Sequence, residues 1–142
     1  MTFVRPPLDF TVSREDWCRY DLADGAILKV KIILTKVRRQ QNNYTIDFQV
    51  IYLVLTNERG TPEPRQFTQQ ELQTSVTNEV RFTTTSQDWN EYIVDDGGRI
   101  RIQPMLTRID RTSRFDAGGE PIYLVQVQGT TQITPPPPFR PT

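Results

Sequence analysis

The chain has 142 residues, with 17 basic and 17 acidic side chains and no histidine. A chain of this length buries roughly two-thirds of its unfolded surface, so one domain can form a core without disulfides or metals. The balanced charge removes the argument from net charge to a nucleic-acid or acidic-membrane partner. The lack of histidine removes the commonest general base and transition-metal ligand, which excludes most hydrolase mechanisms.

Residues 1–9 are interpreted as an N-terminal arm, because Pro6 and Pro7 cannot donate hydrogen bonds to a sheet. This arm lacks the pattern of a secretory signal, and no apolar run reaches the ~20 residues of a membrane span. We therefore expect a cytoplasmic or particle-associated protein. A single cysteine, Cys18, cannot close an intrachain disulfide and is interpreted as a small buried hydrophobe.

Residues 10–39 recur without a gap as residues 82–111, at a constant offset of 72. The identical pairs are Phe10/Phe82, Thr11/Thr83, Asp16/Asp88, Trp17/Trp89, Tyr20/Tyr92, Asp24/Asp96, Gly25/Gly97, Leu34/Leu106, Thr35/Thr107 and Arg39/Arg111. We interpret residues 10–133 as a single β domain of two pseudo-equivalent halves, 10–56 and 82–133. Two small β modules in tandem are the alternative.

Each copy opens with a serine or threonine three residues before an aspartate, Ser13 to Asp16 in the first. This spacing resembles a helix-capping box and indicates one helical turn, with an extended strand as the competing interpretation. Asp24-Gly25 and its repeat then predict a β-hairpin with a tight I′ turn.

The strand after each turn alternates in hydrophobicity until Ile32 and Ile33, where two apolar residues are adjacent. Pro104 replaces Ile32 in the second copy and cannot donate to a ladder. We therefore predict a β-bulge or edge-strand bend at 32–33 and 104–105.

A long strand is predicted from Tyr44 to Leu55, and a matching one over residues 122–133; both contain the sequence IYLV. On the first, one face is apolar throughout, whereas the other changes from polar to apolar at Ile51. The second half of this strand should therefore be covered on both sides. Between the halves, residues 57–66 form a linker, and the capping box of Thr68 and Glu71 predicts a short helix near 69–76.

These elements predict an all-β fold, a mainly antiparallel sandwich or barrel closed around Trp17, Trp89, Tyr20 and Tyr92. No nucleotide-binding or metalloprotease motif occurs, and the repeated aspartates occupy capping and turn positions. We expect no catalytic residue, no metal site and no cofactor.

Basic residues recur on the corresponding strands of the two copies. Lys29 and Lys31 in the first, and Arg99 and Arg101 in the second, could form with Trp17 and Trp89 a surface that pairs phosphates and stacks bases. The ordinary interpretation is a solvated strand face over a core that contains the aromatic rings. Single-stranded nucleic-acid or polyanion binding is thus an alternative function, and carbohydrate binding by the two indoles is a third.

Residues 134–142 form a proline-rich C-terminal arm. Pro135, Pro138 and Arg140 match the pattern that SH3-type grooves bind, and together with Phe139 they are the candidate partner-binding residues. The favoured function is therefore a non-enzymatic structural or interaction protein, such as a subunit of a viral or other large particle. Strand edges and the two arms are expected to contact protein partners or further copies of the chain.

Overall fold

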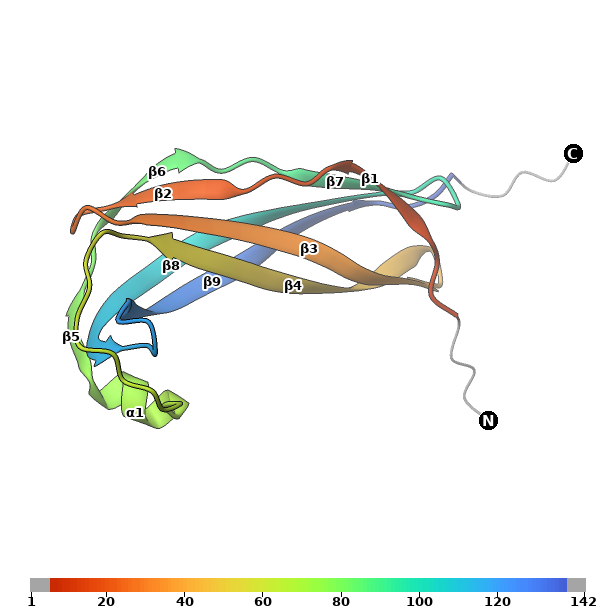
Figure 1. Cartoon of the computed structure of the whole chain (residues 1–142). Coiled ribbons are helices and arrows are strands. Elements are labelled where there is room, and N and C mark those ends of the chain that lie inside the picture. Colours follow the sequence, from red (N-terminus) through yellow and green to blue (C-terminus); the bar gives the residue numbers. More distant parts are fainter. Residues whose placement is uncertain (1–5, 138–142) are drawn as a thin grey trace, which may run out of the picture.

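The protein is an all-β sandwich of two antiparallel sheets, seen in a computed structural model that describes residues 6–137 (Figure 1). The predicted all-β, mainly antiparallel sandwich is confirmed. The elements are β1 (Phe10–Arg14), β2 (Cys18–Leu22), β3 (Ile27–Gln40), β4 (Asn43–Leu55), α1 (Gln69–Thr74), β5 (Val76–Glu79), β6 (Phe82–Ser86), β7 (Asn90–Val94), β8 (Arg99–Phe115) and β9 (Pro121–Thr134).

The two halves of the chain exchange their first strands. One sheet has the order β4-β3-β2-β6, and in the other β1 pairs with β7, which pairs with β8. Strand β1 therefore lies in the sheet of β7 and β8, and β6 lies in the sheet of β2 and β3. Both β5 and β9 also pair with β8, and Figure 1 shows the long hairpins β3–β4 and β8–β9 crossing at an angle.

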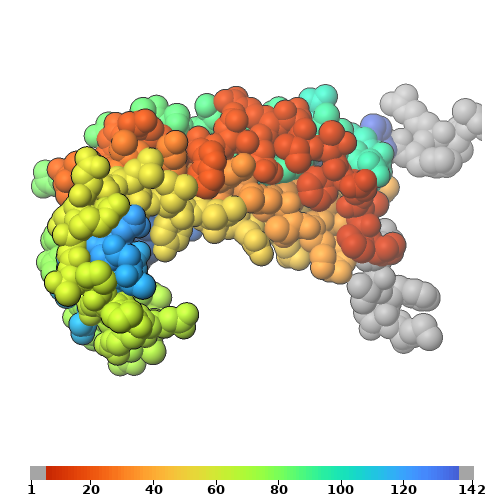
Figure 2. Space-filling model, in the orientation of Figure 1, coloured from red at the N-terminus to blue at the C-terminus, as the bar shows by residue number. Residues whose placement is uncertain are grey.

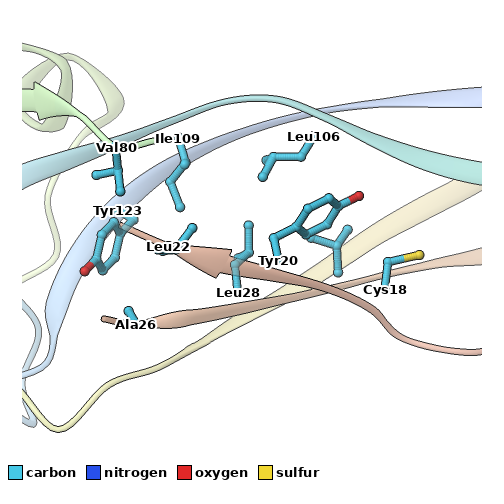
Figure 3. Packing of buried hydrophobic residues seen from close by; sticks show 10 residues of the cluster. Cys18, Tyr20, Leu22, Ala26, Leu28, Val80, Leu106, Ile109 and Tyr123 are labelled. Atoms are coloured by element: carbon cyan, nitrogen blue, oxygen red, sulfur yellow. The ribbon is translucent and has the colours of Figure 1, made fainter. Parts of the chain in front are cut away.

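The core consists of two clusters, and each takes residues from both halves. One is built from β2, the first part of β3, the second part of β8 and the start of β9; Figure 3 shows Tyr20 and Leu22 pointing toward Leu106 and Ile109. The other contains Ile32, Leu34, Val37, Tyr44, Tyr92, Val94, Ile100 and Ile102. Neither cluster belongs to one half alone, so the halves share their core.

Tyrosines, and not tryptophans, are the central aromatic residues of this core. Tyr20 and Tyr92 are fully buried, whereas Trp17 is 39% exposed. The expectation that the indoles fill the core is therefore wrong. Phenylalanines from the exchanged strands complete it instead: the Phe10 ring packs edge-to-face on Tyr92 at 5.7 Å, and the Phe82 ring on Tyr20 at 5.8 Å.

The segments that open each copy are strands, β1 and β6, so the helical-turn interpretation is wrong and the extended one is confirmed. Pairing with a strand of the other half satisfies the backbone groups that a cap would have satisfied. The Asp-Gly hairpins are confirmed, but the turn type differs. In the first turn Gly25 has a positive φ, 91°, but Asp24 does not, and the Gly25 N–H donates to the Leu22 carbonyl, as in a type I turn closed by a glycine bulge.

The β-bulges occur two to three residues later than predicted. Pairing is regular through residues 32–33 and 104–105, and the register shifts at Thr35 and Thr107. The Thr35 hydroxyl donates to the backbone oxygen of Asp47, and the Thr107 hydroxyl donates to that of Gln126, both at 3.0 Å. A hydroxyl that bonds across the bulge compensates for the displaced ladder bond.

Helix α1 begins and ends close to the predicted bounds. Thr68 caps it, with both hydrogen bonds of the capping box formed to Glu71. The helix begins at the predicted Gln69 and ends at Thr74, two residues before the predicted end, because Ser75 is its C-cap and Val76 already belongs to β5. Figure 1 places α1 at the end of the sandwich opposite to the β3–β4 turn.

Candidate protein interface

Strand β4 is the edge of the four-stranded sheet, and its second half is apolar and exposed. Within residues 6–137, β4 pairs only with β3, so one side of its backbone has no strand partner there. Five exposed large apolar side chains follow one another on it: Val50, Ile51, Tyr52, Leu53 and Leu55. Unpaired backbone groups beside exposed apolar side chains are what an added strand requires.

The exposed side chains point to both faces of the sheet. Tyr52 lies opposite Val30, which is fully buried, so its side chain is on the face toward the sandwich interior. Leu53 lies opposite Lys29 and is on the outer face. Tyr52 is nevertheless 47% exposed and Leu53 37%. The sequence expectation that this half-strand is covered on both sides is therefore wrong for the described residues.

Strand β9 provides an internal comparison for β4. Tyr44 lies opposite Arg39, and Tyr123 lies opposite Arg111, so these tyrosines occupy corresponding places at an offset of 79. At this offset residues 50–55 correspond to residues 129–134, and both stretches have the same succession of exposed and half-buried side chains. The IYLV sequences at 51–54 and 122–125 therefore occupy different places.

Equivalent places hold opposite kinds of side chain. Residues 129–134 read GTTQIT, which suits a solvated strand, whereas residues 50–55 read VIYLVL. The fold therefore tolerates a polar sequence at this kind of edge. The apolar side chains on β4 are no more buried than the polar ones at the corresponding places on β9, so packing inside the molecule does not require them. Six consecutive apolar residues without proline or charge are the composition that edge strands usually avoid.

Charges flank this edge but do not interrupt it. Residues 48–57 contain no charged side chain, and Asp47 and Glu58 lie just outside. Lys29 and Lys31 are opposite Leu53 and Ile51 on the neighbouring strand. Both lysines are on the outer face of β3, where the Lys31 ammonium pairs with Glu15, and residues 48–57 of β4 are themselves neutral.

A groove continues from the edge toward β9 and α1. It has a volume of about 290 Å³ beside Tyr52 and Leu53, with Ile122 on its other wall. Ile122 also lines an adjoining groove of about 500 Å³ with Phe67 and Leu72. Figure 2 shows the molecule hollowed below β4, between this strand and the yellow-green segment that carries α1. We call this groove and residues 50–55 the β4 surface.

The predicted basic and aromatic residues form two separate groups. Lys31 places its ammonium 5.5 Å from the Trp17 ring and 3.5 Å from Glu15. Arg101 lies 4.9 Å from the Trp89 ring and 2.9 Å from Glu91. Lys29 is on β3 beside the first group, and Arg99 is on β8 beside the second.

These two groups are on different sheets, β3 in one and β8 in the other. On each strand the alternating residues Val30 and Ile102 are buried, so the basic side chains point away from the core in opposite directions. The structure therefore does not bring the two groups together into one groove, and each has an acidic neighbour.

Of the two predicted arms, residues 6–9 and 134–137 fall within the described residues. Pro135 is exposed beyond the end of β9, and Pro137 lies beside Gly97 in the β7–β8 turn. Pro138, Phe139 and Arg140 lie outside the described residues, as do residues 1–5. In the N-terminal arm, the Leu8 N–H donates to the backbone oxygen of Val37.

The buried residues Asn90 and Cys18 belong to the scaffold. Asn90, which replaces Cys18 in the second copy, accepts from the Asp16 N–H and donates to the Ile32 carbonyl, each at 2.9 Å. Cys18 is buried, and burial raises the pKa of its thiol.

Among residues 6–137, no three acidic, cysteine or histidine side chains gather as metal ligands would. No helix in this range has the length and hydropathy to cross a membrane.

Comparison with protein-family models, with curated proteins and with solved structures found no match to this chain.

Proposed function

We propose that this chain is a non-enzymatic interaction protein whose partner adds a β-strand to the open edge of β4. The observation that supports the proposal is the apolar composition of residues 50–55 at a place where β9 carries polar residues. Strand addition joins the unpaired backbone groups and covers the side chains on both faces. The terminal arms are proposed as secondary contacts, in keeping with an assembly role.

Site-specific photo-cross-linking tests this function. A photoreactive side chain is introduced at Leu53 and, as the matched control, at Gln132, which occupies the corresponding place on β9. We expect a covalent product with another polypeptide from Leu53 and none from Gln132, either in the purified protein, where the partner is a second copy, or in extract of the source cells, where it is a different protein. Equal labelling from the two positions would contradict a specific role for the β4 surface.

Single-stranded nucleic-acid binding is the second candidate. The stacking of cationic groups on Trp17 and Trp89 favours it, because the same rings and charges could engage bases and phosphates. The separation of the two groups on different sheets and their acidic neighbours weigh against it. Titration with a labelled oligonucleotide at low and high salt decides: a salt-dependent affinity that Lys31→Glu removes would favour this function over strand addition.

A further inference from the structure

We infer that the partner of the β4 surface is a second copy of the chain, with two β4 strands pairing antiparallel about a twofold axis. This inference rests on the proposed function and specifies its partner. The paired strands would join the two four-stranded sheets into one continuous sheet. A twofold interface uses the same residues on both subunits, so the strand must be complementary to itself.

The distribution of apolar side chains on β4 supports self-pairing. An extended peptide that is soluble on its own usually alternates apolar and polar residues, so it matches one face of a sheet. Residues 50–55 are apolar on both faces, and a partner strand that covers them has to be apolar on both faces too. The chain's own β4 has this property.

Charge and direction also fit a second copy. Residues 48–57 carry no charge, so antiparallel pairing of two such segments places no like charges opposite each other. If Tyr52 lies on the axis, Ile51 is opposite Leu53 of the other copy, and Val50 is opposite Val54. Neighbouring registers also place apolar residues together over most of the segment. Aromatic and β-branched cross-strand pairs are those that stabilise sheets.

Sedimentation analysis of the full chain tests the inference. We expect a concentration-dependent dimer, whose dissociation constant rises more than about 100-fold in the double variant Ile51→Glu and Leu53→Glu, because like charges then face one another in the centre of the interface, whereas Lys31 and Lys29 compensate them within each chain. The matched control is Thr130→Glu with Gln132→Glu, at the corresponding exposed places on β9, which should leave the dissociation constant within about threefold. Circular dichroism checks that each variant is folded.

A cysteine variant gives a second readout that does not weaken the interface through charge. The native thiol of Cys18 is buried, so Tyr52→Cys introduces the accessible one. A short bifunctional thiol reagent should join two Tyr52→Cys chains and leave Thr131→Cys, the corresponding control, uncoupled. The inference is overturned if the wild-type chain is a monomer at its highest soluble concentration, or if its dimer withstands the two glutamates on β4.

The outcomes for the inference and for the proposed function are separable. A monomer whose Leu53 photo-cross-links to a different protein would overturn the twofold dimer and leave strand addition standing. A monomer that gives no product from Leu53 would overturn both. A dimer lost on deletion of residues 1–5, and unchanged by the two glutamates on β4, would overturn the inference in favour of the N-terminal arm.

Discussion

The hydroxyl of Tyr123 donates a hydrogen bond of 2.5 Å to the carboxylate of Asp24, 99 positions away in the sequence. The equivalent hydrogen bond from the first half to the second is donated by the Tyr44 hydroxyl to the Asp96 carboxylate. Arg111 and Arg39 lie beside these carboxylates at 3.9 and 3.6 Å. Each Asp-Gly turn is therefore held by a tyrosine and an arginine from the other half, which explains why Asp and Arg are identical in both copies.

Removing the hydroxyl of Tyr123 should weaken the fold without emptying the core. We expect Tyr123→Phe to lower the free energy of unfolding by about 1–2 kcal/mol, since Asp24 loses a partner in a partly buried place. Urea denaturation measures this change. Tyr52→Phe is the control, because the Tyr52 side chain is exposed. Equal effects of the two substitutions would show that the Asp24 contact does not stabilise the fold.

Alkaline pH should unfold the protein through its buried tyrosines. Burial raises the pKa of Tyr20 and of Tyr123 to about 12, and it also raises the pKa of Tyr44 and Tyr92. Because the unfolded value is about 10, this stabilisation is complete below about pH 10 and is lost as the pH rises toward the folded values.

Urea midpoints measured across this pH range, together with tyrosinate absorbance, check the alkaline prediction. Midpoints should fall above about pH 10, and less steeply in Tyr20→Phe, which removes one of the raised groups. A midpoint that does not change up to about pH 12 would contradict the proposed burial of these hydroxyls.

Separate halves should not fold, because each core cluster contains residues from both. We expect the fragments 1–57 and 58–142, divided in the exposed linker, to be unfolded alone and to regain β-sheet structure when mixed. Circular dichroism of each fragment and of the mixture measures this. A fragment that unfolds cooperatively by itself would indicate an independent module instead.

Gly98 should not tolerate alanine. A Cβ atom at this position would overlap the hydroxyl and ring of Tyr44, and Tyr44 is held by its hydrogen bond to Asp96. We expect Gly98→Ala to lower the free energy of unfolding by about 1–3 kcal/mol. Gly118→Ala is the control, since its Cβ would meet only Asp116 at an ordinary 3.4 Å, and it should change stability by less than about 0.5 kcal/mol. Thermal unfolding compares the two.

Hydrophobic alternation, turn residues and the capping box are local signals, and they predict the strands, the hairpins and α1 from the sequence. The Asp-Gly hairpins occur where predicted, because glycine adopts a positive φ, as at Gly25, without support from distant parts of the chain. Hydrophobic alternation places the bulges too early in each strand, because it shows that the phase of the pattern slips but not which residue remains unpaired. The hydroxyls of Thr35 and Thr107, which stabilise the bulges, bond to the backbone of a neighbouring strand.

The candidate interface could be predicted only in part. The change to apolar residues on both faces at Ile51 and the lack of charge over 48–57 are visible in the sequence, and they indicate a strand that needs cover on both sides. Whether such a strand lies inside a sheet or at its edge depends on sheet order, which the composition of the strand does not reveal.

The sequence by itself determined an all-β chain with a recurring pattern and apolar strands, since these follow from residue type and spacing. Tertiary structure decided the exchange of β1 and β6, the placement of Trp17 outside the core, and the position of β4 at a sheet edge. These depend on pairing between residues more than 50 positions apart, as in Tyr123 and Asp24, and such contacts leave no local signal in the chain.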